Sequence, residues 1–503
     1  MTTFLARPPV KVPTGIPGLD ALTLGGFPSR RVSLVVGAPG TGKTVLACQY
    51  LAAGARATEP GVFVTFEEPA QDIAGNVASL GWPVAEWMEA DLWRFVDASA
   101  RDDESVVGGD FDLAPLLARI LAAAEEIGAV RVVLDTPDAL FGRLGNDAVI
   151  RAELRRIADA MRQAGLTTLM TTGVTEPADT SPPHGVEEFV ADHVIVMRHE
   201  LDEERRRRTI EVMKMRGSSH LEGRYPFTIV AGEGVTLVPM ATMGGVQGSS
   251  EERVTSGAPA IDAMCGGGLF RGAVVLASGA TGTGKTLLTS HFVAGAKDIG
   301  EKTLLLAYEE NHDQILRNAR AWGFDFASME RDGSLVIEAN YPEAMSLQKH
   351  LVRVKELIEE HDPQRIAVDS LSALERGGSE RSFREFVMTL TSIVKARNAT
   401  AIYTNSTPSL TGGTSITETH ISTLTDSIIM LRYVEMYGEM RRGLTVLKMR
   451  GSGHDKLIRE FTIDGTGLNV GEAFTNVTGI LTGTPVHRDL DEVERLQQLF
   501  DER

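Results

Sequence analysis

The chain contains two copies of one sequence unit, and this duplication limits the possible folds more than any other feature. The motif GAPGTGKT at 37–44 returns as GATGTGKT at 279–286, which is 242 residues later. The motif VMKMRGSSH at 212–220 returns as VLKMRGSGH at 446–454, which is 234 residues later. The difference of eight residues corresponds to one net deletion in the second copy. We therefore predict that the chain folds as two similar units.

The boundaries of the two copies predict the domain organisation. The copies span roughly 12–240 and 254–480 in a chain of 503 residues. The stretch GGVQGSSEER between them is rich in glycine and serine and carries charge, as linkers do. The last residues have helical periodicity, with Leu490, Val493, Leu496 and Phe500 on one side, so this segment either pairs with another helix or frays. We predict an N-terminal domain, a linker, a C-terminal domain and a helical tail at 1–243, 244–253, 254–485 and 486–503.

Short β-branched runs alternate with stretches rich in alanine and leucine inside each copy. VSLVVGA and RVVLD are typical of buried strands, whereas TVLACQYLAAGA and AELRRIADAMRQAG have helical periodicity. Strands that alternate with helices favour a sheet of mainly parallel strands with helices against it. The fold class we predict is therefore α/β, with one mainly parallel central sheet in each of two tandem P-loop domains.

Composition and charge exclude several classes of protein. No apolar run approaches the roughly 20 residues needed to cross a bilayer, and the N-terminus lacks the apolar segment of a signal peptide. Only Cys48 and Cys265 occur, which argues against a disulfide framework and fits a reducing cytosol. The formal net charge of −18 repels nucleic-acid phosphates on average. We expect a cytoplasmic protein with no membrane partner and no nucleic-acid partner.

Each copy carries the phosphate-binding pattern G-x-x-x-x-G-K-T between an expected strand and an expected helix. Glycines let backbone N–H groups face the β-phosphate, the lysine reaches the β- and γ-oxygens, and the threonine hydroxyl binds Mg²⁺. A glycine-rich turn without a ligand is the alternative, but it does not explain two matches in the same context. The pattern predicts ATP and Mg²⁺ as cofactors, bound by Gly37, Gly42, Lys43 and Thr44 in the first copy and by Gly279, Gly284, Lys285 and Thr286 in the second.

Carboxylates follow two of the expected strands in each copy. Asp135 and Asp369 each end an apolar run, where an acid can hold the water shell of a metal ion, although a helix cap is the alternative. A pair of glutamates ends the strand after each P-loop helix. Adjacent carboxylates repel each other unless a metal or a proton is present, so one can polarise an attacking hydroxyl while the other supports the metal. A solvated loop is the alternative for these pairs, which are Glu67–Glu68 and Glu309–Glu310.

The motif KMRG ends a strand-like run in both copies. Residues at i and i+2 point to one face of a strand, so Lys214 acts with Arg216 and Lys448 with Arg450. Two cations aimed in one direction can meet the triphosphate of a neighbouring subunit, as arginine fingers do, whereas a surface basic pair is the alternative. In an acidic chain, the run ERRRRT at 204–209 is more typical of a solvated or interface-facing strand end than of a nucleic-acid site.

Over about 12–485, the chain resembles the KaiC family, whose members are double-ring, RecA-like ATPases and autokinases of the circadian clock. The shared features are the tandem P-loops, TFEE and YEE, GVEEFV, the two KMRG strands and, most specifically, SITETHISTLTDS at 415–427. P-loops alone would indicate only the wider RecA/DnaB class. The resemblance implies two RecA-like domains stacked as a double ring, a homohexamer with ATP between neighbouring subunits, a slow ATPase in the first ring and an autokinase in the second.

The resemblance also implies roles for single residues. Ser422 and Thr423 are the implied phosphoacceptors, Thr417 a relay between them, and Glu309 the general base acting on the neighbouring subunit. Glu67 is the implied base toward water in the first ring, Glu68 lies beside it, and Thr44, Thr286 and Glu310 are the implied Mg²⁺ ligands. Trp322 is the implied adenine contact. The other implied ATP contacts are Gly40, Thr41, Gly42, Lys43, Val45, Ser79, Lys214, Met215, Arg216, Ser218 and His220 in the first unit and Thr281, Gly282, Thr283, Gly284, Lys285, Leu287, Lys448, Met449, Arg450, Ser452, His454 and Lys456 in the second.

The two copies differ where the second carries its acceptors. Ser422 and Thr423 in the second copy correspond to Glu188 and Phe189 in the first. Neither glutamate nor phenylalanine accepts a phosphoryl group stably. We therefore expect the first copy to deliver the γ-phosphoryl group to water and the second to deliver it to a hydroxyl.

The chain also departs from the family pattern. Glu418 follows the relay threonine where the family often has aspartate, and Gly453 replaces a bulky aromatic residue near the second nucleotide. The acidic tail differs most, which leaves dependence on a KaiA-like activator or a KaiB-like partner open. Two other functions also remain open: a RecA-like DNA motor, and a signalling scaffold in which ATP only holds the ring together.

Overall fold

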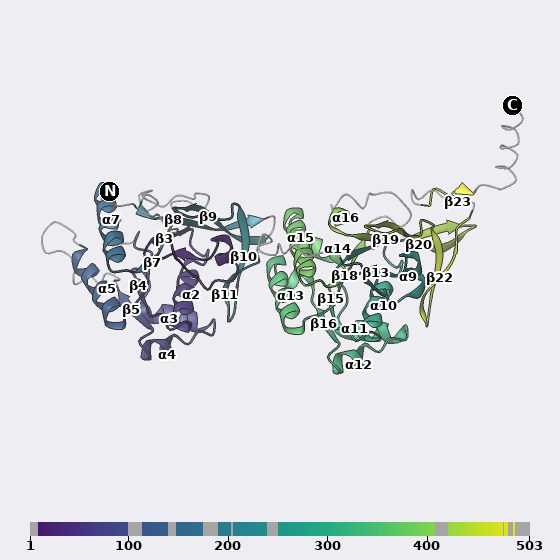
Figure 1. Ribbon diagram of the computed structural model, residues 1–503, viewed down its shortest axis with the longest axis horizontal. Helices are drawn as coiled ribbons and strands as arrows, with labels where there is room; N and C mark the ends of the chain where they lie inside the picture. Colours follow the sequence, from purple (N-terminus) through teal and green to yellow (C-terminus); the bar gives the residue numbers. More distant parts are fainter. Residues whose placement is uncertain are drawn as a thin grey trace, which may run out of the picture. The chain divides into compact units, whose positions relative to one another are not determined.

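The structure, a computed structural model, describes residues 9–98, 113–138, 147–174, 190–202, 205–238, 250–407, 421–475, 477–480 and 486–487. The chain divides into two compact units, Met1–Thr242 (unit 1) and Met243–Arg503 (unit 2). Each unit is built on one large sheet with helices on its faces (Figure 1). All of the predicted tail except its first two residues, that is 488–503, lies outside the described residues.

The described part of unit 1 contains a nine-stranded sheet in the order β11-β10-β9-β8-β3-β7-β6-β4-β5. Strands from β8 to β5 in this order run parallel, whereas β9, β10 and β11 extend the sheet in antiparallel pairs. The strands are β3 (Val32–Gly37), β4 (Gly61–Thr65), β5 (Trp93–Asp97), β6 (Arg131–Asp135), β7 (Thr167–Thr172), β8 (His193–Asp202), β9 (Arg205–Met215), β10 (Arg224–Val230) and β11 (Gly234–Leu237); β1 (Lys11–Val12) pairs with β2 (Phe27–Pro28) separately.

Helices cover both faces of the unit 1 sheet because its central strands are apolar on both sides. Val35 of β3 belongs to a buried cluster with α2, whereas its neighbours Leu34 and Val36 belong to a cluster with α5 and α7. Successive side chains of a strand point to opposite faces, so a continuous apolar strand needs cover on each side. The helices are α1 (Leu19–Leu22), α2 (Lys43–Arg56), α3 (Ala70–Ala78), α4 (Val84–Glu89), α5 (Ala114–Ile127) and α7 (Asp147–Gln163).

Unit 2 repeats this topology in its described residues. Its nine-stranded sheet has the order β16-β15-β17-β18-β14-β19-β20-β21-β22, and β20 to β22 are again antiparallel. The strands are β14 (Val274–Gly279), β15 (Thr303–Ala307), β16 (Leu335–Ala339), β17 (Arg365–Asp369), β18 (Thr400–Ser406), β19 (Ser427–Met436), β20 (Glu439–Met449), β21 (Arg459–Asp464) and β22 (Gly467–Ala473), and the short pairs are β12 (Arg253–Val254) with β13 (Leu269–Phe270) and β23 (Val477–Thr478) with β24 (Val486–His487).

The unit 2 sheet also has helices on its faces. α10 (Lys285–Lys297), α11 (His312–Ala321) and α12 (Phe326–Arg331) share one buried cluster with β14, whereas α13 (Leu347–His361) and α15 (Glu380–Ala396) lie side by side (Figure 1). The remaining helices are α9 (Pro259–Met264), η2 (Pro342–Ala344), α14 (Leu371–Glu375) and α16 (Ile421–Leu424). The predicted α/β class, with two tandem domains and mainly parallel sheets, is confirmed. None of the helices in the described ranges is long and apolar enough to cross a membrane.

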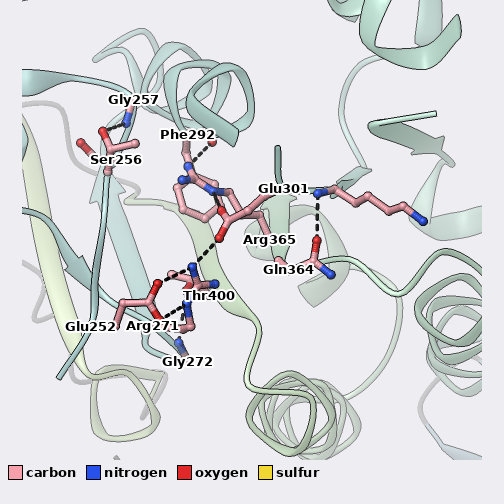
Figure 2. Close-up of polar contacts among 12 residues, drawn as sticks. Glu252, Ser256, Gly257, Arg271, Gly272, Phe292, Glu301, Gln364, Arg365 and Thr400 are labelled. Atoms are coloured by element: carbon pink, nitrogen blue, oxygen red, sulfur yellow. Dashed lines mark hydrogen bonds and ion pairs between the residues drawn. The ribbon is translucent and has the colours of Figure 1, made fainter. Parts of the chain in front are cut away.

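A buried ion pair joins β17 to the turn before β15 in unit 2. Arg365, whose side chain is 0% exposed, donates from Nε to Glu301 at 2.6 Å and from Nη1 to the Phe292 carbonyl oxygen at 2.8 Å. Arg271 pairs with the other Glu301 oxygen at 2.6 Å and with Glu252, so the charges form a chain (Figure 2). Unit 1 has the same pair, Arg131 and Glu59, at 2.6 Å, but there the glutamate side chain is 44% exposed.

We expect Glu301→Leu to destabilise unit 2 by about 3–5 kcal/mol, because it leaves a buried guanidinium without its carboxylate. The matched change Glu59→Leu in unit 1 should cost less, since that glutamate is half in solvent and screened. Urea-dependent hydrogen exchange of peptides from β17 and β6 measures both losses in the full chain. An equal or smaller loss at β17 would show that burial does not set the strength of this pair.

Candidate functional site

In both units the P-loop connects the central strand to the N-terminus of a long helix. Gly42 and Gly284 precede the first helical residue with φ values of 102° and 104°, in the region that favours glycine. The threonine before each glycine donates its hydroxyl to a loop carbonyl, from Thr41 at 2.9 Å and from Thr283 at 2.7 Å. Each loop therefore curls with the N–H groups of a helix N-terminus at its centre, which is a site for phosphate.

The predicted P-loop contacts lie together in each loop. Gly40, Thr281 and Gly282 are exposed at the crest, whereas Leu287 is buried and Val45 half-buried on the first turn of their helices. A side chain at Gly40 would meet nothing within 4 Å, so the crest is open to a ligand. The N–H groups of the loop and of the helix N-terminus fit the phosphates of a nucleoside triphosphate.

The P-loop lysines lie on the carbonyl oxygens of their own loops. Lys43 Nζ donates to Gly37 at 2.7 Å and Ala38 at 3.2 Å, and Lys285 Nζ donates to the corresponding oxygens of Gly279 and Ala280 at 2.9 Å each. Burial lowers the pKa of both lysines, and nearby carboxylates raise it. Each ammonium is therefore held beside the loop whose N–H groups would bind the phosphate.

The threonine after each lysine contacts the aspartate that ends the neighbouring strand. Thr44 donates to Asp135 Oδ2 at 3.0 Å, and Thr286 hydrogen-bonds Asp369. Burial raises the pKa of both aspartates, and the hydrogen bonds of these threonines lower it. A hydroxyl and a carboxylate side by side are the oxygen ligands that suit a water-rich Mg²⁺ site, so the described residues fit Mg²⁺ beside a bound nucleotide.

The glutamate pair of unit 2 is held by specific donors. Glu309 Oε1 accepts from the Ser370 hydroxyl at 2.7 Å. Glu310 accepts from Asn318 Nδ2 at 3.0 and 3.1 Å, and burial raises its pKa. One pocket brings these glutamates together with the predicted metal and adenine residues; it is lined by Thr286, Thr289, Ser290, Leu305, Ala307, Glu309, Glu310, Ile315, Asn318, Trp322 and Asp369.

The glutamate pair of unit 1 lies at the same place in its sheet but has different neighbours. Burial raises the pKa of Glu67, and the charges of Asp138 and Asp135 raise it further. Within the described residues, no donor forms a hydrogen bond with the Glu67 carboxylate, which contrasts with Glu309. Ser79 ends α3 exposed, and its hydroxyl donates to the Asn76 carbonyl oxygen at 2.6 Å.

The KMRG residues and the P-loop of the same unit lie at opposite ends of the sheet's strands. We use 'edge' for the side of the sheet formed by these strand ends. In unit 1 Lys214 pairs with Val194, whereas Met197 pairs with Gly37 at the start of the P-loop. Val194 and Met197 are three residues apart along β8, which corresponds to about 10 Å at 3.3 Å per residue. The P-loop then extends further away from Lys214. Unit 2 has the same arrangement through Ile428 and Leu431. The structure thus does not bring these cations to the phosphate site of their own unit.

The same edge holds the predicted acceptor segment of unit 2. Arg450 Nη2 donates to the Thr423 carbonyl oxygen at 3.0 Å, and Lys448 Nζ donates to the Thr425 carbonyl oxygen at 2.7 Å. Thr423 is exposed on α16. Thr417, Glu188, Phe189 and the side chain of Ser422 lie outside the described residues. The cations and one acceptor therefore share an edge, away from their own P-loop.

The other predicted nucleotide contacts differ in exposure. Met215 and Met449 are buried in the cores, so only their backbone is available to a ligand. Ser452 accepts from Arg253 at 2.6 Å. The remaining ones lie exposed or half-buried after the strand ends, and they are Arg216, Ser218, His220, His454 and Lys456.

The arginine run of unit 1 contacts protein groups. Arg207 pairs with Asp202 at 3.7 Å, and Arg208 Nη2 donates to the Gly40 carbonyl oxygen at 3.3 Å. The run is thus part of a strand that reaches the P-loop crest.

Sequence reasoning missed several residues that touch the site. Thr171 and Thr404 each donate to the strand-end aspartate of their unit, at 2.6 and 2.5 Å. Ser370 and Asn318 hold the glutamates of unit 2, and in unit 1 the charge of Asp138 raises the pKa of Glu67. A signal existed for the threonines, because both stand near the ends of strands adjacent to the P-loop strand.

Comparisons with known proteins agree with this geometry. The chain matches the profile of the family described as "ATPase: KaiC" at residues 12–242 and again at 254–474. It is 49% identical over 494 residues to the circadian clock protein KaiC3 of Synechocystis sp., covering 98% of each chain. It is 46% identical to the circadian clock oscillator protein KaiC of Thermostichus vulcanus, over 97% of this chain and 94% of that protein. The same protein of Synechococcus elongatus is 45% identical over 97% and 94% of the two chains.

Proposed function

This chain belongs to the KaiC family of ATPases, and on that premise we propose that it is an autokinase of the clock or timing type. In this proposal unit 1 delivers the γ-phosphoryl group of ATP to water. Unit 2 delivers it to Ser422 or Thr423 and also takes part in removing it. The phosphorylated residues would add charge at a subunit interface, where they can change the affinity for a partner.

The position of Thr423 carries this proposal. Thr423 is exposed and lies with Lys448 and Arg450 at the edge of the sheet opposite the P-loop of unit 2. An acceptor at that edge cannot reach its own phosphate site but can reach one on an adjacent copy. We therefore propose transfer between neighbouring subunits in a closed ring, and the family supports a homohexamer of two stacked rings.

The residues of unit 2 then have separate tasks. Lys285 and the P-loop N–H groups would hold the phosphate oxygens, and Thr286, Glu310 and Asp369 would hold Mg²⁺ and its water shell. Bound Mg²⁺ would neutralise charge on the phosphates. Glu309 would take the proton of the acceptor hydroxyl as the hydroxyl oxygen bonds to the γ-phosphorus, while the bond from phosphorus to the bridging oxygen breaks and ADP leaves. Trp322 would contact the adenine, and the neighbour's Lys448 and Arg450 would reach the nucleotide.

The proposal also concerns partners and location. A KaiB-like protein is the partner that we propose from the resemblance to the KaiC family, and the relative from Thermostichus vulcanus is named as a circadian clock oscillator protein. The tail departs most from the family pattern, so we do not propose a KaiA-like activator. We propose a cytoplasmic location with no membrane partner. We also propose that no nucleic acid binds, because a net charge of −18 repels its phosphates on average.

Mass spectrometry tests the kinase step directly. The purified chain is incubated with Mg²⁺ and ATP without other proteins, and its intact mass and peptides are measured. We expect added phosphate on Ser422 or Thr423, lost in the double change Ser422→Ala with Thr423→Ala and kept in Thr462→Ala, a control at an exposed hydroxyl on β21. Phosphate that survives the double change would refute the acceptor assignment. ATP hydrolysis without any phosphoprotein would favour the scaffold, and DNA-stimulated hydrolysis would favour the motor.

A further inference from the structure

Asp138 of unit 1 lies at the phosphate edge of the sheet, between the ends of two strands. It follows β6 by three residues, and it is half-buried. Its Oδ1 accepts from the Thr172 hydroxyl at 2.7 Å, and its Oδ2 accepts from the Gly173 backbone N–H at 2.6 Å. The side chain is thus anchored to the end of β7.

The Asp138 carboxylate lies close enough to two reacting groups of unit 1 to affect them electrostatically. Its charge raises the pKa of Lys43 and of Glu67, and for Glu67 it is the largest influence after burial, ahead of Asp135 and Glu68. In the order of the sheet, β6 lies between β7 and β4, and Glu67 follows β4. Two carboxylates from the ends of adjacent strands therefore lie near the P-loop lysine.

Unit 2 has a serine at the equivalent place. Ser372 stands 234 residues after Asp138, and its hydroxyl accepts from the Ser406 backbone N–H at 3.1 Å, as Asp138 accepts from Gly173. Ser372 is also 2.8 Å from the Ser370 hydroxyl, which donates to Glu309. Asp138 thus places a carboxylate near Glu67 in unit 1. At the equivalent position of unit 2, Ser372 is instead part of a chain of hydroxyls that ends on Glu309.

This difference matches the two acceptors of the proposed reactions. Water carries two O–H bonds, so in a site shielded from solvent it needs two hydrogen-bond acceptors to be oriented. A serine or threonine hydroxyl carries one O–H bond and is oriented by its own chain. One carboxylate is therefore enough for a hydroxyl acceptor, whereas a water molecule is held in one orientation by a pair.

We infer that Asp138 is the second acceptor for the attacking water in unit 1 and a determinant of the choice between water and a hydroxyl. Glu67 takes one proton of this water as its oxygen bonds to the γ-phosphorus. The bond from phosphorus to the bridging oxygen breaks, and its electrons leave with ADP. Asp138 accepts the other O–H as a hydrogen bond and keeps the lone pair of the oxygen aimed at phosphorus. This inference rests on the proposed function of the two units.

The test uses the full chain in a Glu309→Gln background, where phosphate release reports on unit 1. Asp138→Ser places the unit 2 residue in unit 1. Asp138→Asn keeps partners for the β7 end, because its oxygen can accept from Gly173 and its amide can donate to the Thr172 hydroxyl, but it has no charge. We expect both variants to lower kcat about tenfold while KM for ATP stays within about twofold. A wild-type rate in Asp138→Asn would reduce Asp138 to a structural tether and overturn the inference, as would a wild-type rate in Asp138→Ser.

The reciprocal change is a gain of function that misfolding cannot imitate. Ser372→Asp, in a Glu67→Gln background, should raise the ratio of free phosphate to phosphoprotein formed by unit 2 several-fold, and an unchanged ratio would overturn the inference. If no phosphoprotein forms even without Ser372→Asp, the proposed kinase has failed. The Asp138 variants still test the inference in that case, because they report on hydrolysis alone.

Discussion

Glu309→Gln is expected to lower the rate of phosphoryl transfer to Ser422 and Thr423 by about 10²- to 10⁴-fold. The glutamine side chain has nearly the same shape, and its oxygen can still accept from the Ser370 hydroxyl as Glu309 does at 2.7 Å. It has no ionised oxygen to take the proton of an acceptor hydroxyl. The loss should therefore appear in the rate and not in the affinity for ATP. Single-turnover incubation with γ-labelled ATP, followed by peptide mapping, measures it.

The duplication supplies the matched control for this change. Glu67→Gln alters the equivalent glutamate of unit 1, which we expect to lower phosphate release while the phosphoprotein still forms. The two variants should thus separate hydrolysis from transfer within one chain. Phosphorylation at the wild-type rate in Glu309→Gln would remove Glu309 from the reaction, and Glu310 would then be the next carboxylate to change.

The clustering of the P-loop, the aspartate and the glutamate pair in each unit can be predicted from the sequence because it follows from strand polarity. Parallel strands end at the same side, so a P-loop after one strand, an aspartate after another and a glutamate pair after a third must meet. The structure places Lys43, Thr44 and Asp135 in this way, with Thr44 bonded to Asp135 at 3.0 Å. The alternating pattern indicated parallel strands but not their order, which the structure supplies.

Contacts between side chains of different strands could not be predicted in the same way. Ser370 holds Glu309 across two adjacent strand ends. Asp138 and Glu67 follow the equivalent pair of strands, and the charge of Asp138 raises the pKa of Glu67. Neither Ser370 nor Asp138 stands in a recognised motif. Their roles depend on rotamers and on short loops after β6 and β17, for which periodicity carries no information. The position of the KMRG residues is another example. The i and i+2 spacing predicts that the lysine and the arginine share a face, whereas the antiparallel register decides at which end of the strands they lie.

Lys43→Met and Lys285→Met are each expected to weaken ATP binding at the changed site by roughly 100-fold or more. Removing one partner of a buried, hydrogen-bonded charge pair costs about 2–5 kcal/mol, and each 1.4 kcal/mol is about tenfold in affinity. The cost is high here because each lysine is the cation among the acids of its site. The charges of Asp135, Asp138 and Glu67 raise the pKa of Lys43, and those of Asp369 and Glu309 raise the pKa of Lys285. Without the ammonium, these carboxylates repel the phosphates.

A fluorescent ATP analogue titrated against the full chain should resolve this loss, because each variant removes one class of site and leaves the other. Lys297→Met is the matched control for unit 2, since Lys297 ends the same helix α10 and its side chain is 47% exposed. If the control weakened binding as much as Lys285→Met, the effect would come from the helix as a whole and not from the P-loop.

If ATP assembles the ring by lying between subunits, the Lys43 and Lys285 variants should also lose ATP-dependent assembly in sedimentation, at the same nucleotide concentrations at which binding is lost. Assembly that persists without binding would place the subunit contacts outside the nucleotide sites and would contradict transfer between neighbours through them.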